Sequence, residues 1–419
     1  MKYTLAEIAD INKFSISKSD NLQEIIYLDT SSITENLISG TCIIPLPEAP
    51  SRAQRKVKSN TIVYSTVRPR LKHYGILNSP PYNLIVSSGF VTIDLKKEYE
   101  DRIDARYLFL LLTQPAITEY IACIADSAVS AYPSFNPSDI SEIAFSFPNI
   151  EKQKAISETW SNFEQKISIN RQINDNLEAM AKQLYDYWFV QFDFPNEEGK
   201  PYKSSGGAMV WNEKLKREIP EGWYAENICK IANILSGGTP SKAVDEYWNN
   251  GTIPFFGPTD CNGSVFQIKT ADHITQKGLE HCASSLFEEG IVIITARGSI
   301  GKLVIVGTPM AMNQSCYALQ SKEGEYEYLY FLTTQLIDCL KAKGSGSVFK
   351  SIIASDIEHS TLCIATENVV SDFCKKVKPL FEKLKANTIE IAELTKQRDE
   401  LLPLLMNGQA TVNYHLSDD

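Results

Sequence analysis

Two arginines that follow short apolar runs are the residues whose placement first suggests a chemical role. The run 291–294 leads to Arg297, with a glycine and a serine directly after it. An arginine at the end of a strand, beside small residues, can reach a guanine edge or a phosphate with little steric obstruction. In the first half of the chain a similar run, at 62–63, leads to Arg68. We therefore expect Arg68 and Arg297 to occupy equivalent positions and to contact DNA.

Further basic and small polar residues extend this predicted contact set. Three basic residues follow Arg68 closely, and the Gly-rich segment 236–241 could let backbone amides approach a phosphate. A loop near 345–350 matches one near 128–133 when the two halves of the chain are aligned. The predicted DNA contacts are Arg68, Arg70, Lys72, His73, Ser130, Ser236, Gly237, Gly238, Thr239, Ser241, Arg297, Ser299, Lys302, Ser345, Ser347 and Lys350.

Two segments resemble catalytic motifs but lack parts that those motifs need. Residues 79–82 read Ser-Pro-Pro-Tyr, which fits the tetrapeptide with which amino-methyltransferases hold a flipped adenine. Such an enzyme also needs a Gly-rich turn after a strand for its cofactor, and no such turn precedes residue 78. Residues 298–302 resemble a phosphate-binding loop, but Leu303 stands where a metal-binding Ser or Thr is required. The five histidines show no ligand spacing, so we predict no catalytic residue and no metal site.

The chain is an internal duplication. Ser-Asp-Ile at 138–140 recurs at 355–357, an offset of 217 residues. Tyr-Leu at 107–108 with Thr-Gln at 113–114 recurs at 328–329 and 334–335, after small shifts that loop insertions explain. Each half therefore consists of a globular region of mixed strands and helices followed by one long helix, an α+β fold in which two repeated globular domains are separated by two long antiparallel coiled-coil helices.

The two long helices are predicted from apolar residues that alternate in steps of three and four, the heptad pattern of a packed helix seam. A stretch of this length would extend about 50 Å, enough to span one turn of B-DNA, about 34 Å. Asn170 and Asn387 occupy equivalent seam positions, so we expect them to face each other in an antiparallel pair and to hydrogen-bond. The predicted seam consists of Ile156, Trp160, Phe163, Ile167, Asn170, Leu177, Leu184 and Trp188 with Phe373, Val377, Leu380, Leu384, Asn387, Leu394, Leu401 and Leu405.

Size and composition fit a folded protein of at least two domains. The chain has 419 residues, of which 43% are hydrophobic and 22% charged. No apolar run reaches the roughly 18 residues that span a bilayer, and nine cysteines without a Cys-x-x-Cys pair suit free thiols in a reducing cytosol. The net charge of −10 disfavours binding of nucleic acid by bulk electrostatics. DNA contact then requires either a local basic face or phosphate contacts from a partner subunit.

Several motifs together resemble the DNA-specificity subunits of type I restriction-modification enzymes. Residues 184–192 (LYDYWFVQF) resemble the close of that family's central conserved helix, and residues 402–408 (LPLLMNG) resemble its C-terminal conserved segment. Residues 219–223 (IPEGW) followed by 236–241 (SGGTPS) resemble the opening of a target-recognition domain. The resemblance covers essentially the whole chain in the family's order, although the first domain lacks a Gly-Gly-Thr-Pro-Ser opening.

The resemblance implies a cytoplasmic, non-catalytic subunit that binds double-stranded DNA. Each recognition domain would read one half of a bipartite target, and the helices would dock two methyltransferase subunits. Two motor-nuclease subunits would be added for restriction. S-adenosylmethionine, ATP and Mg²⁺ would act on those partners, with no cofactor on this chain. An adenine-specific DNA methyltransferase and a coiled-coil scaffold that binds no DNA are the alternatives.

Residues that form turns and cap helices set the predicted boundaries. A polar, Gly-rich stretch separates the halves, and Asn407-Gly408 is placed to end the last helix with a left-handed cap. The predicted segments are recognition domain 1 at 1–148, a central spacer helix at 149–195, a linker at 196–221, recognition domain 2 at 222–366, a C-terminal spacer helix at 367–408 and a tail at 409–419.

Overall fold

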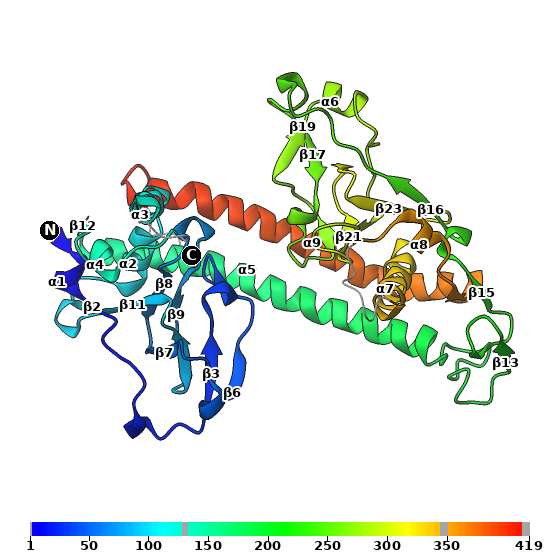
Figure 1. Cartoon of the computed structure of the whole chain (residues 1–419), viewed down its shortest axis with the longest axis horizontal. Coiled ribbons are helices and arrows are strands. Elements are labelled where there is room, and N and C mark those ends of the chain that lie inside the picture. Colours follow the sequence, from blue (N-terminus) through cyan, green and yellow to red (C-terminus); the bar gives the residue numbers. More distant parts are fainter. Residues whose placement is uncertain (1, 128–132, 344–350, 413–419) are drawn as a thin grey trace, which may run out of the picture. The chain divides into compact units, whose positions relative to one another are not determined.

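The computed structural model of the chain describes residues 2–127, 133–343 and 351–412. Contacts divide it into two compact units (Figure 1). Unit 1 comprises Met1–Glu164 with Gln397–Asp419, and unit 2 comprises Gln165–Lys396. Each unit therefore contains one globular domain and a part of each long helix.

Unit 1 is built on two four-stranded sheets, as far as the described residues go. One sheet is antiparallel, in the order β2 (Ala9–Ile11), β11 (Phe90–Leu95), β8 (Thr61–Ser65), β9 (Tyr74–Leu77). The other is mixed, in the order β6 (Cys42–Pro45), β3 (Glu24–Leu28), β10 (Leu84–Ser87), β7 (Ala53–Lys56). Two short pairs, β1 (Lys2–Thr4) with β12 (Ala144–Ser146) and β4 (Ile33–Thr34) with β5 (Leu37–Ile38), complete its strands. The helices are α1 (Leu5–Ile8), α2 (Ala105–Leu112), α3 (Pro115–Ser127) and α4 (Pro137–Ser141).

Unit 2 is built around a five-stranded sheet within the described residues. Its order is β16 (Ala232–Ser236), β23 (Cys316–Ser321), β20 (Val292–Thr295), β21 (Leu303–Val306), β18 (Phe266–Gln267). A second sheet has the order β19 (Asp272–Ile274), β17 (Ile253–Phe256), β22 (Ala311–Met312). Two strand pairs join β13 (Met209–Asn212) to β14 (Arg217–Pro220) and β15 (Tyr224–Glu226) to β24 (Leu362–Ile364). The helices are α6 (Gln276–Glu280), α7 (Tyr326–Lys343) and α8 (Ala354–Glu358).

The duplication is confirmed by the pairing of equivalent elements. The first strand of each domain, β1 or β15, pairs antiparallel with the strand that precedes the long helix, β12 or β24. The repeated Ser-Asp-Ile tripeptide lies in α4 in the first copy and in α8 in the second. In both copies a fully buried strand, β8 or β20, lies between a long neighbour, β11 or β23, and a hairpin partner, β9 or β21.

The register of the repeat corrects the predicted equivalence of Arg68 and Arg297. Ser65 pairs with Phe90, the first residue of β11, as Thr295 pairs with Cys316, the first residue of β23. Thr66 therefore corresponds to Ala296. The amide of Phe135 donates to Thr66 O (3.1 Å) and that of Ile352 donates to Ala296 O (2.9 Å), and these two donors are related by the 217-residue offset. Both correspondences give the same register for this part of the repeat.

By this register Arg297 corresponds to Val67, and Arg68 corresponds to Gly298. Both members of the second pair have positive φ, 49° at Arg68 and 75° at Gly298. The sequence match of these two segments was one residue out of step, which in a strand turns every side chain to the opposite face. The prediction that the two arginines are equivalent is therefore wrong, although both side chains are exposed.

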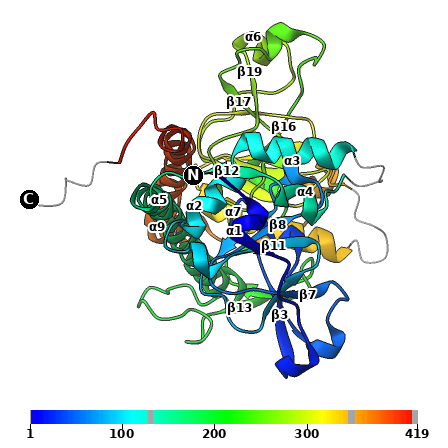
Figure 2. The same cartoon turned by 90° about the vertical axis from the view of Figure 1, so that its left-hand side faces the viewer.

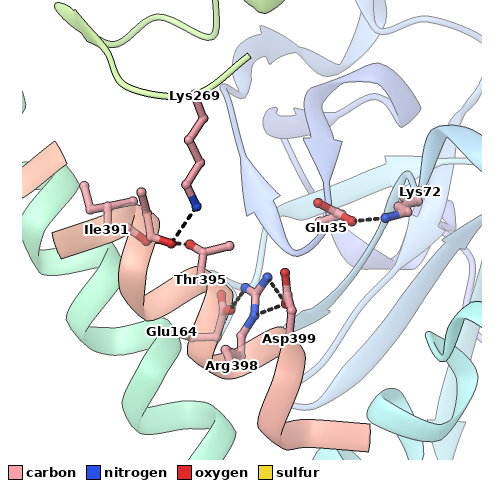
Figure 3. Close-up of polar contacts among 9 residues, drawn as sticks. Glu35, Lys72, Glu164, Lys269, Ile391, Thr395, Arg398 and Asp399 are labelled. Carbon is pink, nitrogen blue, oxygen red and sulfur yellow. Dashed lines mark hydrogen bonds and ion pairs between the residues drawn. The ribbon is translucent and has the colours of Figure 1, made fainter. Parts of the chain in front are cut away.

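The two long helices are α5 (Ile150–Tyr185, 36 residues) and α9 (Glu367–Met406, 40 residues). Figures 1 and 2 show them side by side, and contacts within each unit show that they run antiparallel. In unit 2, the Tyr185 and Phe373 rings lie 5.9 Å apart, and Asn170 donates to Glu390 (3.0 Å). In unit 1, Arg398 is paired with Glu164 (Figure 3). The predicted end of α9 is confirmed, because the helix stops at Met406 and Gly408 has φ 73°.

The asparagine pairing predicted for these helices is wrong. Asn170 Nδ2 donates to Glu390 Oε2 (3.0 Å), whereas Asn387 Nδ2 donates to Asn174 Oδ1 (2.9 Å). Asn174 Nδ2 lies 3.4 Å from the hydroxyl of Thr388. The centre of the antiparallel register thus lies beyond Asn170 and Asn387, so each contacts a residue about one turn beyond its repeat-mate.

The predicted seam positions vary in burial, and some pack on the globular domains. The Trp160 ring lies 5.5 Å from that of Phe109 in α2, and Trp188 belongs to an aromatic cluster with Phe373. The buried positions are Ile156, Trp160, Ile167, Asn170, Trp188, Phe373, Val377, Leu384, Asn387 and Leu405. The half-buried positions are Phe163, Leu177, Leu184, Leu380, Leu394 and Leu401.

The segment expected to be a linker, 196–221, contains the hairpin of β13 and β14. The chain first leaves α5 through a π-helical turn, Asp186–Val190. The ring of Phe194 then stacks against Tyr202 (4.6 Å) and Trp223 (5.1 Å). Aromatic contacts and a hairpin therefore accompany a stretch that its polar, Gly-rich composition predicted to be a linker.

Within the described part of the chain, no single helix combines the length and apolarity needed to cross a membrane. Among the helices described, α2 and α3 meet that criterion only when taken together, and they are bent by 59° relative to each other.

Candidate nucleic-acid interface

Three loops of unit 2 meet at one edge of the five-stranded sheet. Strand β16 ends at Ser236 beside Tyr317 of β23, and β20 ends at Thr295 beside Cys316. The loops that follow β16 (236–241) and β20 (296–302) therefore lie beside the turn that precedes β23 (313–315). Antiparallel pairing of these strands is the reason that segments far apart in sequence converge there.

Arg297 extends from this edge on a fixed backbone. The amides of Ala296 and Arg297 both donate to Ser315 O, at 2.8 and 3.2 Å. The strand before them is fully buried from Val292 to Thr295, whereas Arg297 is exposed. In the described part of the chain its guanidinium has no hydrogen-bond or ion-pair partner. An exposed, unpaired guanidinium on a rigid loop is suited to a phosphate or a guanine edge.

The hairpin loop between β20 and β21 is closed by Thr295. Its hydroxyl bonds Ser299 O and accepts from the amide of Lys302 (2.9 Å). The Lys302 ammonium lies 3.4 Å from Cys261 O, while Ser299 is exposed. Ser299 is therefore accessible on the same hairpin loop as Arg297, whereas Lys302 is already directed toward a backbone carbonyl.

The two glycines of the 236–241 loop serve close packing in this structure. A Cβ on Gly237 would lie 2.3 Å from Asn313 O, and one on Gly238 would lie 2.7 Å from Ala283 N. Both glycines are buried, and the Gly238 amide donates to Met312 O (3.0 Å). The Gly238 amide is therefore committed to the fold, which opposes the phosphate-binding role predicted for it.

The polar side chains of the same loop are accessible to different degrees. The Thr239 hydroxyl is bonded to the side-chain oxygen of Gln314. Ser236 and Ser241 are exposed, and Ser241 O accepts from the indole of Trp248 (3.1 Å).

In unit 1 the basic residues near Arg68 are engaged in local contacts. Arg70 is paired with Glu119 (2.7 Å) and Asp126 (2.6 Å), and its hydrogen bond to Glu119, aided by its charge, holds the pKa of Glu119 below the usual value. Lys72 is paired with Glu35 at 2.5 Å (Figure 3). These exposed ion pairs neutralise the cations that the sequence suggested as DNA contacts.

His73 and Arg68 differ from that pattern. The Nδ1 atom of His73 lies 2.7 Å from Ile33 O and 3.0 Å from Thr34 Oγ1, so the ring is fixed by the neighbouring hairpin. Arg68 is exposed, with its amide bonded to Pro133 O (2.9 Å). Four of the predicted contacts, Ser130, Ser345, Ser347 and Lys350, lie outside the described residues.

Sequence reasoning missed the turn 313–315. No apolar run or glycine pattern marks Asn313, Gln314 or Ser315 in the sequence. The hydrogen bond between Thr239 and Gln314 joins residues 75 positions apart, which no local signal indicates.

The Ser-Pro-Pro-Tyr segment is a surface turn between β9 and β10. Ser79 has φ 47°, and Tyr82 is 85% exposed. An aromatic ring so far in solvent forms no pocket wall for a flipped base.

Two lysines of unit 2 hold the globular domain on α9. Lys269 donates to Ala392 O (3.1 Å), and Figure 3 shows Lys269 bonded to α9 beside Ile391. Lys385 of α9 is paired with Glu289 (2.5 Å). These lysines connect the domain to the helix.

Comparison with known proteins identifies the family. The family model described as "Type I restriction modification DNA specificity domain" matches residues 1–179 and 220–365. The type I restriction enzyme HindI specificity subunit of Haemophilus influenzae is 24% identical, over 92% of this chain and 94% of that protein. The MjaIX specificity subunit of Methanocaldococcus jannaschii is 27% identical, over 83% of this chain and 77% of that protein.

The fold is shared with a solved S subunit of a type I restriction-modification system from M. genitalium. That chain is 16% identical, with a TM-score of 0.56 over 97% of this chain and 95% of that one. The chain described here belongs to the type I restriction-modification DNA specificity family and is a non-catalytic, DNA sequence-recognition subunit.

Proposed function

We propose that the two globular domains each read one half of a bipartite DNA target, through the loops that carry Arg68 in unit 1 and Arg297 in unit 2. The observation that carries the proposal is the edge of the unit 2 sheet where, among the described residues, Arg297 has no hydrogen-bond or ion-pair partner for its guanidinium. The corresponding edge of unit 1 presents Arg68 one residue further along the same loop. The register difference means that the two domains contact their half-sites with different geometry.

Most of the basic residues discussed above are paired within the protein, so few of them remain for contacts with DNA phosphates. A net charge of −10 leaves little general attraction for DNA. Base contacts from a few exposed residues give specificity, whereas phosphate contacts give most of the affinity. We therefore propose that partner subunits supply the larger share of the phosphate contacts.

The duplication also supports a partner stoichiometry. Each repeat ends in one long helix, so the pair α5 and α9 offers two related surfaces. We propose that two methyltransferase subunits dock on them, and that two motor-nuclease subunits join for restriction. S-adenosylmethionine, ATP and Mg²⁺ would then serve those subunits.

DNA binding by the assembled methyltransferase tests the proposal. The substrates are the full target and two variants in which one half-site is scrambled. Arg297→Ala should weaken binding to targets that contain the half-site of unit 2, and Arg68→Ala should act on the other half-site. Arg102→Ala, an exposed arginine elsewhere in unit 1 (58% exposed), is the matched control. If both variants lose affinity equally for either half-site, or lose none, the assignment of one half-site to each domain is wrong.

A further inference from the structure

The turn 313–315 holds an exposed glutamine on a fixed backbone. The Asn313 amide donates to Phe256 O (2.9 Å), and the Asn313 side chain accepts from the Ser315 amide (2.9 Å). Ser315 O in turn accepts from the two amides beside Arg297. Gln314 lies between these anchored residues and is exposed, so its Cα position is set while its side chain remains accessible.

The side chain of Gln314 is also oriented. The hydroxyl of Thr239 is hydrogen-bonded to Gln314 Oε1. Thr239 reaches it because Gly237 packs directly against the backbone of Met312 and Asn313, where a Cβ would lie within 2.4 Å of both carbonyl oxygens. The close approach at Gly237 therefore brings the hydroxyl of Thr239 to the amide of Gln314.

The oriented amide keeps the groups that recognise adenine. A carboxamide oxygen has two lone pairs, and Thr239 uses one of them. Within the described residues, Gln314 Nε2 has no hydrogen-bond partner, so both of its N–H groups and one lone pair remain available. Adenine presents a donor at N6 and an acceptor at N7 in the major groove, which a glutamine amide matches with two hydrogen bonds.

We propose that Gln314 reads an adenine in the half-site bound by unit 2, with Thr239 as the positioning residue that fixes its amide. This inference rests on the proposed function and names the base contact of that same site. Arg297 lies on the adjoining loop, where it contacts a guanine or a phosphate next to that adenine.

Unit 1 has the same turn with a different residue at this position. The Gly89 amide lies 3.2 Å from Ser87 Oγ, as the Ser315 amide lies 2.9 Å from Asn313 Oδ1. The amide of Thr66 donates to Gly89 O (2.9 Å), as Ala296 does to Ser315 O (2.8 Å). Ser88 thus stands where unit 2 has Gln314. A hydroxyl cannot form the two-bond contact, so the two half-sites differ at this position, and Ser88 supplies a matched control.

The test is the sequence preference of the assembled methyltransferase on a randomised DNA library, read as methylated adenines. Gln314→Ala should reduce the preference for adenine at one position of one half-site by roughly ten-fold, the size of a lost bidentate contact. Thr239→Val should reduce it at the same position, and Thr239→Ser, which keeps the hydroxyl, should restore it. Ser88→Ala should leave that position unchanged.

Three outcomes would overturn the inference while the proposed function stands. One is an unchanged preference in Gln314→Ala when Arg297→Ala still weakens binding. Another is a uniform loss of methylation on all sequences, which indicates a phosphate contact. The third is a changed base preference at a target position where adenine is not the preferred base. If neither Gln314→Ala nor Arg297→Ala has an effect, the proposed function fails with it.

Discussion

Arg297 combines a backbone held by Ser315 O with an exposed guanidinium that has no partner among the residues the structure describes. We expect Arg297→Ala to weaken specific DNA binding by about 1–3 kcal/mol and to reduce the salt dependence if the contact is to phosphate. Arg297→Lys keeps the charge but loses the planar fork, so it separates the two kinds of contact. Equilibrium binding at several salt concentrations measures both effects. An Ala variant with unchanged affinity and salt slope would contradict a DNA contact.

Asp94 in β11 is a buried carboxylate that makes the free energy of unfolding of unit 1 depend on pH. It is 1% exposed, Thr61 Oγ1 donates to it (2.5 Å), and its Oδ2 has no hydrogen-bond partner within the described residues. Burial raises the pKa of Asp94, against the hydrogen bond from Thr61 and the charges of Lys58 and Lys13, while Asp10 adds to the rise.

The raised pKa means that the native state binds this proton more tightly than the unfolded state, in which the pKa is about 3.9. The free energy of unfolding therefore falls as pH rises from the unfolded pKa to the folded pKa, and the loss is complete above it. We expect Asp94→Asn to raise the melting temperature at neutral pH but not at about pH 3. Asp101→Asn, at an exposed carboxylate (70% exposed), should leave the melting temperature unchanged at both pH values. A stabilisation that is equal at both pH values would exclude ionisation as its cause.

The sequence predicted the exposure of Arg297, because a glycine and a serine follow a strand that consists of apolar residues. It could not predict the ion pairs of Arg70 and Lys72, since Glu119, Asp126 and Glu35 come from segments 37 to 56 positions away. Gln314 was missed for the same reason. Its orientation depends on a hydroxyl that only the folded sheet brings close.

At the scale of elements, α5 and α9 show what periodicity can and cannot establish. Heptad spacing predicted both helices, and the Asn-Gly pair predicted where α9 ends. The heptad spacing of the apolar residues does not determine the axial offset between the two antiparallel helices. That offset also depends on how the helices pack against α2 and α7. Strand register was missed for a related reason: a one-residue slip between repeats is visible only when the partner strands are known.

The corrected helix register makes a prediction about coupling between asparagines. Asn387 is fully buried and bonds Asn174, so removing either partner leaves the other with an unsatisfied amide. We expect a double-mutant cycle of Asn174→Leu and Asn387→Leu to give a coupling energy of about 0.5–1.5 kcal/mol in the free energy of unfolding.

The pair Asn170 and Asn387 is the matched control, because Asn170 bonds Glu390 instead. Its coupling should fall within the roughly 0.3–0.5 kcal/mol seen for independent sites. Chemical denaturation of the four variants in each cycle measures both values. A larger coupling for Asn170 with Asn387 would support the pairing expected from the sequence and contradict the structure.

At the scale of the whole molecule, the duplication explains why one chain can read two different sequences. Helix α5 starts in unit 1 and continues into unit 2 without a break, and α9 returns. If the helix pair sets the distance between the half-sites, a matched insertion of one heptad, about seven residues, near Asn174 in α5 and near Asn387 in α9 should lengthen the gap. The added helix is about 10 Å, or roughly three base pairs of B-DNA. Methylation at the original gap by this variant would show that the helices do not determine the spacing.

The central claim is that two repeated domains recognise two separate half-sites. The most direct measurement is a map of the methylated adenines in DNA modified by the assembled methyltransferase. The account predicts two short specific blocks of different sequence, separated by a non-specific gap of fixed length. A single uninterrupted recognition sequence, or two specific blocks with a variable gap, would contradict it.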